Sequence, residues 1–176
     1  MTCHSLGPSC ACYDVLLFLL LQFGAVEPPR LFFSGEELEL KSLLGTGGTA
    51  TAYQSTVQLH GKEQPVAVKL LHDGGSSRAA HEVAILQHLQ GCNGIVRLVG
   101  PLDDGAGLVL QPVGKSLAAL KEALDSPTLF ECMPALLDAV REVHDRGVVH
   151  RDLRSCNLLM AEDKATRRSE LLIMDW

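Results

Sequence analysis

Apolar and polar residues alternate along Leu38–Leu59, on either side of a glycine-rich centre. Alternation with a period of two is typical of β-strands, so this stretch predicts a strand, a turn and a second strand. The short β-branched run Gln64–Leu71 predicts a third strand. Two further apolar runs, Gly94–Gly100 and Gly107–Gly114, predict two more strands with a turn between them.

Apolar residues at helical spacing predict three helices. The first covers about Arg78–Leu89, and two more are expected at Ser116–Leu124 and Thr128–Arg146. Short strands should follow within Gly147–Met160 and Glu170–Trp176. Strands and helices occur in blocks rather than in strict alternation, so we predict an α+β fold. The expected buried faces are Val83, Leu86 and Leu89 in the first helix, and Phe130, Met133, Leu137, Val140 and Val143 in the long one.

Residues 1–37 differ from the rest, and we interpret them as a hydrophobic leader. Their apolar run Val15–Phe23 has one polar residue, Gln22, and is too short for a bilayer span, which needs about 20 residues. The run has the composition of a signal-peptide core, yet no Lys or Arg precedes it. We expect a short docked helix or a poorly ordered leader, with secretion as the alternative.

Composition narrows the class of protein. The 176 residues suffice for one domain with a hydrophobic core, and 47% of them are apolar. The net charge of −6 argues against nucleic-acid partners and against attraction to an anionic membrane. The six cysteines contain no Cys-x-x-Cys pair, so a zinc site is not expected. Reduced thiols in a cytoplasmic protein are the interpretation we prefer, and the oligomeric state stays open.

Two features indicate a site for a phosphate group. The glycines of Gly45–Tyr53 let the backbone turn tightly, and the N–H groups of such a turn can face phosphate oxygens, although an ordinary β-turn fits this stretch alone. Lys69 ends an apolar strand, where a buried ammonium is costly unless it is paired. Glu82 on the following helix is the expected partner, with a solvated helix surface as its alternative role.

The string His150–Asn157 carries the strongest signal for chemistry. Asp152 can accept a proton from an attacking hydroxyl, and Asn157 offers a neutral oxygen to a magnesium ion held against a triphosphate. Asp175 follows an apolar strand, and its carboxylate can bind the same ion.

These motifs together resemble the first half of a eukaryotic-type protein kinase domain, over residues 38–176. The stretch from Gly45 to Ala50 resembles the glycine-rich loop, Val66–Lys69 the strand with the ATP-contacting lysine, and His150–Asn157 the catalytic loop. Met174–Trp176 resembles the start of the Asp-Phe-Gly element. The resemblance implies a small antiparallel β lobe with one helix, about residues 38–113, and the beginning of a helical lobe, residues 114–176.

The resemblance also implies ATP and Mg²⁺ as cofactors and a protein substrate. Asp152, Lys69 and Asn157 would be catalytic, and Asn157 and Asp175 would hold the metal. His150 would pack beside Trp176. The residues implied in nucleotide binding are Gly45, Thr46, Gly47, Gly48, Ala67, Lys69, Glu82, Gln111, Val113, Asn157 and Asp175.

Two departures from the family pattern set the alternatives. Ala50 stands where a third glycine is usual, and the chain ends before the glycine of Asp-Phe-Gly. We therefore expect a truncated domain, in which Leu153, Leu158 and the long helix expose apolar surface. A serine or threonine is favoured over tyrosine as the acceptor. The alternatives are a pseudokinase-like module that binds nucleotide or a partner, and a small-molecule kinase of related fold.

Overall fold

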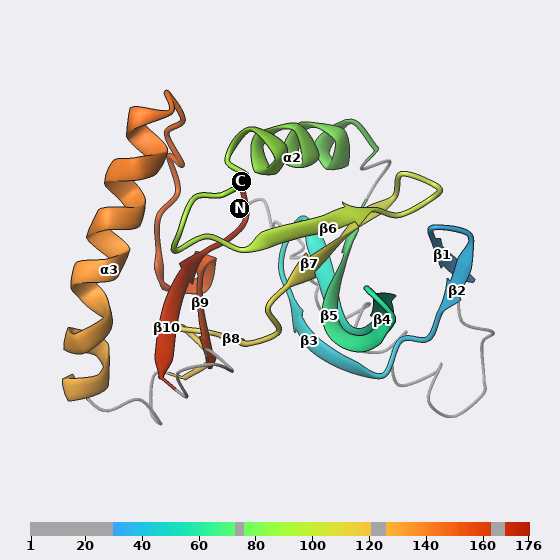
Figure 1. The fold of residues 1–176 in the computed structure, drawn as a ribbon, viewed down its shortest axis with the longest axis horizontal. Helices are drawn as coiled ribbons and strands as arrows, with labels where there is room; N and C mark the ends of the chain where they lie inside the picture. The colour runs from blue at the N-terminus through green and yellow to red at the C-terminus, as the bar shows by residue number, and fades with distance from the viewer. Residues whose placement is uncertain (1–29, 73–75, 121–125, 163–167) are drawn as a thin grey trace, which may run out of the picture.

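The computed structural model describes residues 30–72, 76–120, 126–162 and 168–176. Most of the predicted leader, including its apolar run 15–23, lies outside these ranges. Figure 1 shows two β-rich parts side by side: a larger sheet with one helix above it, and a smaller sheet flanked by a second helix. Among the described residues, no helix is long and apolar enough to cross a membrane.

The larger sheet has five antiparallel strands in the order β3-β4-β5-β7-β6. Buried and half-buried residues alternate along much of β4, as the period of two requires. The predicted strands of this region are confirmed. Their bounds are β3 Ser42–Thr46, β4 Ala50–Leu59, β5 Lys62–Leu71, β6 Arg97–Pro101 and β7 Gly107–Gln111.

Both faces of the larger sheet are covered. Helix α2, Ser76–His88, matches the predicted first helix within two residues and buries Ala79, Glu82 and Leu86. A hairpin of β1, Leu31–Phe33, and β2, Glu36–Leu38, packs on the other face, where Leu31 and Leu38 join a cluster with strand residues. The sheet is therefore held between a helix and a hairpin, with Glu82 on the helix side.

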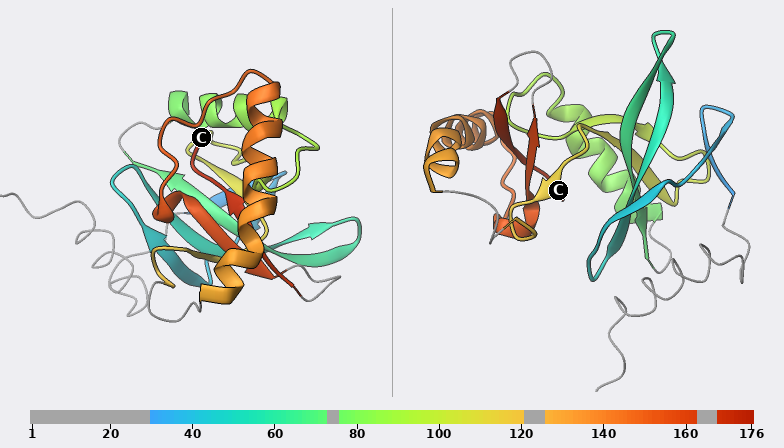
Figure 2. Two further views of the ribbon diagram at one scale, coloured as in Figure 1. Left: turned by 90° about the vertical axis from the view of Figure 1, so that its left-hand side faces the viewer. Right: turned by 90° about the horizontal axis from the view of Figure 1, so that it is seen from below.

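The smaller sheet has the order β10-β9-β8, from β8, Lys115–Ser116, β9, Leu158–Glu162, and β10, Ser169–Ile173. Figure 2 shows it beside the larger sheet, with α3, Ser126–Asp145, along its outer side. The end of β10 is joined to the loop before β6, because Ile173 N donates to Gly94 O at 2.9 Å and Val96 N donates to Ile173 O at 3.0 Å.

The helix predicted at Ser116–Leu124 is wrong over the described residues 116–120. Ser116 pairs with Leu159 as part of β8, and turns follow over 117–120. Gly114 explains part of the difference, because a side chain there would collide with the Met160 carbonyl. That close approach draws the segment to the edge of β9, where strand pairing takes precedence over helical spacing.

The long helix exists, but its predicted buried face is partly wrong. Phe130 is 73% exposed and Leu137 is 59% exposed, whereas Val143 is buried. The helix packs on β10 through a stripe that includes small residues, and Phe130 and Leu137 lie outside this stripe. The expected exposed apolar surface is confirmed for this helix and for Leu153, but Leu158 is buried in β9. The buried stripe is Cys132, Leu136, Ala139 and Val143.

Gly94 permits the contact between the two parts of the molecule. Its φ is +71°, and a Cβ there would collide with the Cβ of Ala139 on α3. We predict that Gly94→Ala lowers the free energy of unfolding by about 2–4 kcal/mol, because it adds a steric clash to a left-handed backbone. Urea denaturation measures the change.

Gly91→Ala is the matched control, since Gly91 has φ +86° and no atom lies within 4 Å of the place that a Cβ would take. It should cost only the backbone term, about 1–2 kcal/mol. Equal losses for the two variants would contradict a specific contact between Gly94 and α3.

Candidate active site

Lys69 lies near the end of β5, in the middle of the larger sheet, with Ala52 and Leu108 as cross-strand neighbours. Its side chain is 11% exposed. The ammonium Nζ lies 2.7 and 2.6 Å from the two carboxylate oxygens of Glu82, and 2.6 Å from Oδ1 of Asp175. A nearly buried cation is thus neutralised by two carboxylates, that of Glu82 on the following helix and that of Asp175 near the end of the sequence.

Glu82 is the more buried partner, with 4% of its surface exposed. Burial raises the pKa of Glu82, and the Lys69 ammonium opposes that rise only in part. The backbone N–H of Trp176 also donates to Glu82, and it too favours the ionised form. This contact could not be predicted from the sequence, because nothing in the sequence shows which backbone groups meet a side chain.

The segment between α3 and β9 brings Asp152 and Asn157 together. Asn157 is buried at 4% exposure, and its Nδ2 donates to the carbonyl O and the Oδ2 of Asp152 at 2.9 and 3.0 Å. Oδ1 of Asn157 makes no hydrogen bond to the described residues and stays available as an acceptor. Arg154 Nε lies 3.1 Å from Oδ2 of Asp152, whose side chain is 57% exposed. Asp152 is therefore held in place yet accessible.

Backbone contacts tie Asp175 to this segment. Met174 N donates to Asn157 O at 3.0 Å. His150 Nε2 lies 2.8 Å from Met174 O, and it must be the donor because a carbonyl only accepts. The rings of His150 and Trp176 lie 4.8 Å apart at an angle of 57°, as the resemblance implied. Asp152, Asn157 and Asp175 are therefore gathered at one end of the smaller sheet.

The glycine-rich segment forms the end of β3 and the turn into β4. Gly47 N donates to Ala50 O at 2.8 Å. A Cβ built at Gly45 or Gly48 would meet no atom within 4 Å, and none of the three glycines has a positive φ. The hydroxyl of Thr46 is buried without a hydrogen-bond partner among the described residues. The protein's own packing thus gives no reason for glycine at these positions.

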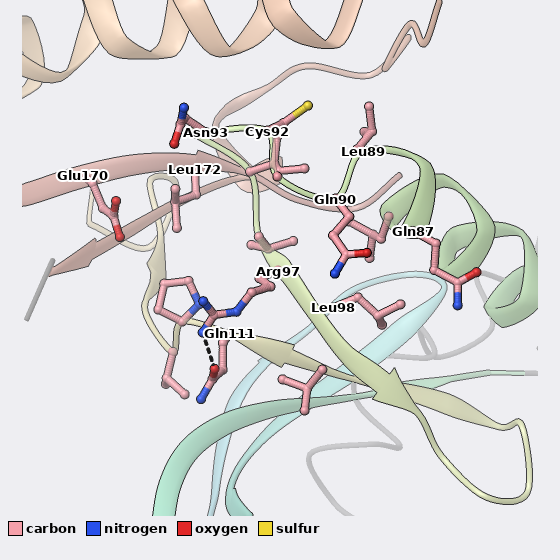
Figure 3. Close-up of a pocket in the computed structure, with 18 of the residues that line it drawn as sticks. Gln87, Leu89, Gln90, Cys92, Asn93, Arg97, Leu98, Gln111, Glu170 and Leu172 are labelled. Atoms are coloured by element: carbon pink, nitrogen blue, oxygen red, sulfur yellow. Dashed lines mark hydrogen bonds between the residues drawn. The ribbon is translucent and has the colours of Figure 1, made fainter. Parts of the chain in front are cut away.

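A cavity of about 360 Å³ lies between Thr49 of this turn, Lys69, Glu82 and Asp175. A larger cavity of about 810 Å³ lies elsewhere, behind Gln111–Val113 and next to the end of α2 (Figure 3). None of the predicted acidic or cationic site residues lines the larger cavity. The candidate active site is therefore the smaller cavity, where the charged side chains converge.

The residues expected at the adenine edge lie along adjoining strands. Ala67 pairs with Leu110 between β5 and β7, and Gln111 ends β7, with Val113 two residues further on. The Gln111 side chain is engaged on the side shown in Figure 3, where it accepts from Arg97 at 2.6 Å and donates to Pro65 O at 3.0 Å.

The comparisons with known proteins all point to one family. The sequence model of the protein kinase domain matches residues 38–176. The chain is 32% identical over 152 residues to cyclin-dependent kinase F-1 of Oryza sativa subsp. japonica, covering 76% of this chain and 29% of that protein.

Two further relatives are similarly distant. Calcium/calmodulin-dependent protein kinase type IV of Mus musculus is 30% identical, over 72% of this chain and 28% of that protein. The DNA damage-responsive serine/threonine-protein kinase RqkA of Deinococcus radiodurans is 34% identical, over 69% of this chain and 20% of that protein. The chain spans less than a third of the length of these three relatives.

The raised pKa of Glu82 gives a prediction with a defined sign. Between its ordinary pKa of 4.5 and the raised pKa of the folded state, Glu82 holds a proton in the folded protein that the unfolded chain releases. The contribution of Glu82 to stability is therefore most favourable at or below that pH and falls as pH rises toward the raised pKa. As pH rises over this range, we expect the unfolding free energy of wild type to fall relative to that of Glu82→Gln. Urea denaturation of both proteins measures the difference.

Glu63 provides a control, because its pKa is shifted in the opposite direction to that of Glu82. A hydrogen bond from Thr56 and the charge of Lys41 lower the pKa of Glu63, so its contribution is lost as pH falls through that lowered pKa. A pH-independent difference between wild type and Glu82→Gln would show that Glu82 titrates as it does in the unfolded chain.

Proposed function

The chain belongs to the protein kinase domain family, and we propose that it binds Mg-ATP and supports transfer of the γ-phosphoryl group to a hydroxyl of a protein substrate. The observation that carries this proposal is the placement of the Lys69 ammonium at 2.6 Å from both Glu82 and Asp175. In this arrangement Glu82 orients Lys69, and Lys69 binds the α- and β-phosphates.

The oxygen atoms at the site suit magnesium, which prefers carboxylate and carbonyl ligands. Asn157 uses its amide N–H groups on Asp152, so its Oδ1 is the atom left for a cation. Asp175 uses Oδ1 on Lys69, and its other oxygen makes no hydrogen bond to the described residues. Asn157 and Asp175 would hold the metal, which neutralises charge on the phosphates when bound.

The glycine-rich segment suits a triphosphate on steric grounds. Open space at Gly45 and Gly48 lets a ligand approach the backbone more closely than side chains would allow. Backbone N–H groups of residues 45–48 would then donate to phosphate oxygens. Ala67 would face the adenine ring, and the backbone of Gln111 and Val113 would contact its polar edge.

Asp152 would accept the proton of the substrate hydroxyl. Its exposed carboxylate is oriented by Asn157 and Arg154, which leaves it reachable by a second reactant. Serine or threonine is the proposed acceptor, since one of the relatives, RqkA, is named a serine/threonine-protein kinase. The cytoplasm is the proposed compartment.

A nucleotide-binding module without transfer is the second candidate. The close contact between Lys69 and Asp175 favours it, because Asp175 must share its charge with Lys69 before it binds a metal. The two candidates differ at Asp152, which transfer needs and binding does not.

We predict that Lys69→Met abolishes Mg-ATP binding, whereas Asp152→Asn retains binding and lowers phosphoryl transfer by about 100-fold or more. Calorimetry measures Mg-ATP binding, and a phosphotransfer assay with a protein substrate measures transfer. Asp138→Asn is the control, because Asp138 is a surface carboxylate paired with Arg141 on α3.

Wild-type binding by Lys69→Met would contradict the proposed phosphate site. Undiminished transfer by Asp152→Asn would remove Asp152 from its role, and absence of transfer by the wild type with normal Mg-ATP binding would favour the second candidate.

A further inference from the structure

The C-terminal ends of α2 and α3 are joined by a compact set of hydrogen bonds. Arg146 follows the last residue of α3, and its side chain is 34% exposed. Nη1 of Arg146 donates to Gln90 O at 2.9 Å and to His88 O at 3.3 Å. Nη2 pairs with Glu142 Oε1 at 3.3 Å. One guanidinium thus binds two carbonyl groups at the end of α2 and a carboxylate of α3.

The contact is reciprocal. His88 Nε2 lies 3.0 Å from the Arg146 carbonyl, so the imidazole donates its Nε2 proton there. The second carboxylate oxygen of Glu142 accepts from Asn93 N at 3.3 Å. Burial and a hydrogen bond with Glu142 raise the pKa of the Cys92 thiol, which keeps it protonated as a donor. We call His88, Glu142 and Arg146 the brace.

Arginine is well suited to this position. The last carbonyl groups of a helix have no partner within the helix and carry partial negative charge, so a cation there is favourable. The planar guanidinium presents several N–H groups in fixed directions and can bind two carbonyls and a carboxylate at once. A lysine ammonium keeps the charge but not this geometry.

Two residues of the brace, His88 and Arg146, lie close in sequence to residues of the candidate site. Glu82 precedes His88 by six residues on α2, and Asp152 follows Arg146 by six residues. Six helical residues span about 9 Å, so a shift or rotation at His88 is transmitted directly to Glu82. The contact of Gly94 with Ala139 and the hydrogen bonds of Ile173 support the same loop independently of Arg146.

We propose that Arg146 is a positioning residue, which fixes α2 and so aims Glu82 at Lys69 relative to the segment carrying Asp152 and Asn157. This inference rests on the proposed nucleotide site. Because the other contacts of the loop remain when Arg146 is removed, the effect should appear in nucleotide binding rather than in global unfolding.

The test is a double-mutant cycle with Mg-ATP as the probe. Arg146→Ala should weaken Mg-ATP binding about tenfold, whereas in a Glu82→Gln background it should weaken binding less than about threefold. Calorimetry measures the affinities. Trp176 is the single tryptophan and lies beside His150, so its fluorescence reports a local change at the site.

Arg141→Ala is the matched control, because Arg141 is an exposed arginine of α3 that pairs only with Asp138 among the described residues. It should leave the affinity and the fluorescence unchanged. If Arg146→Ala does not fold, Arg146→Lys carries the test with a loss of about threefold, since the ammonium cannot reproduce the fork.

Wild-type affinity in both Arg146 variants, or an equal loss in the Glu82→Gln background, would overturn the inference and leave the proposed function intact. Failure of the wild-type chain to bind Mg-ATP would contradict the proposed function, and this inference with it.

Discussion

The buried ammonium of Lys69 is the constraint on which the rest of the arrangement depends. A cation at 11% exposure in the middle of a sheet is costly unless opposite charges reach it. Glu82 comes from α2 and Asp175 from the segment after β10, so both parts of the molecule must dock correctly to neutralise one group. Burial also raises the pKa of Glu82, and the Lys69 ammonium opposes that rise only in part.

Two independent sets of contacts join the two parts of the molecule. One runs through β10, whose Ile173 joins the loop before β6 and whose continuation delivers Asp175. The other runs through the brace, where Arg146 binds the last carbonyls of α2. The first set of contacts brings Asp175, the proposed metal ligand, to Lys69, and the second is the one that we propose positions Glu82. A bound nucleotide would add a third set of contacts between the two parts of the molecule.

The sequence predicted the strands of the larger sheet, the helix of Glu82 and the pairing of Glu82 with Lys69. Those predictions succeeded because apolar and polar residues that alternate with a period of two are typical of a strand, and because a buried charge is costly unless it is paired. The face of α3 was mispredicted in part, since the buried stripe runs through Cys132 and Ala139, whereas Phe130 and Leu137 are exposed. Residues 116–120 became strand and turn because Gly114 permits close approach to β9, a tertiary effect without local signal. Arg146 lay in no motif, and only the meeting of two helix ends showed its contacts. The roles of Asp152, Asn157 and the glycine-rich segment stay predictions.

In the proposed function, the Lys69 ammonium binds the phosphates of a nucleotide. The most direct measurement uses an acyl-phosphate derivative of ATP, which transfers its acyl group to an amine beside the phosphates, followed by mass spectrometry of the labelled lysines. The expected result is labelling of Lys69 that excess Mg-ATP suppresses. Labelling confined to other lysines, or labelling of Lys69 that Mg-ATP leaves unchanged, would contradict it.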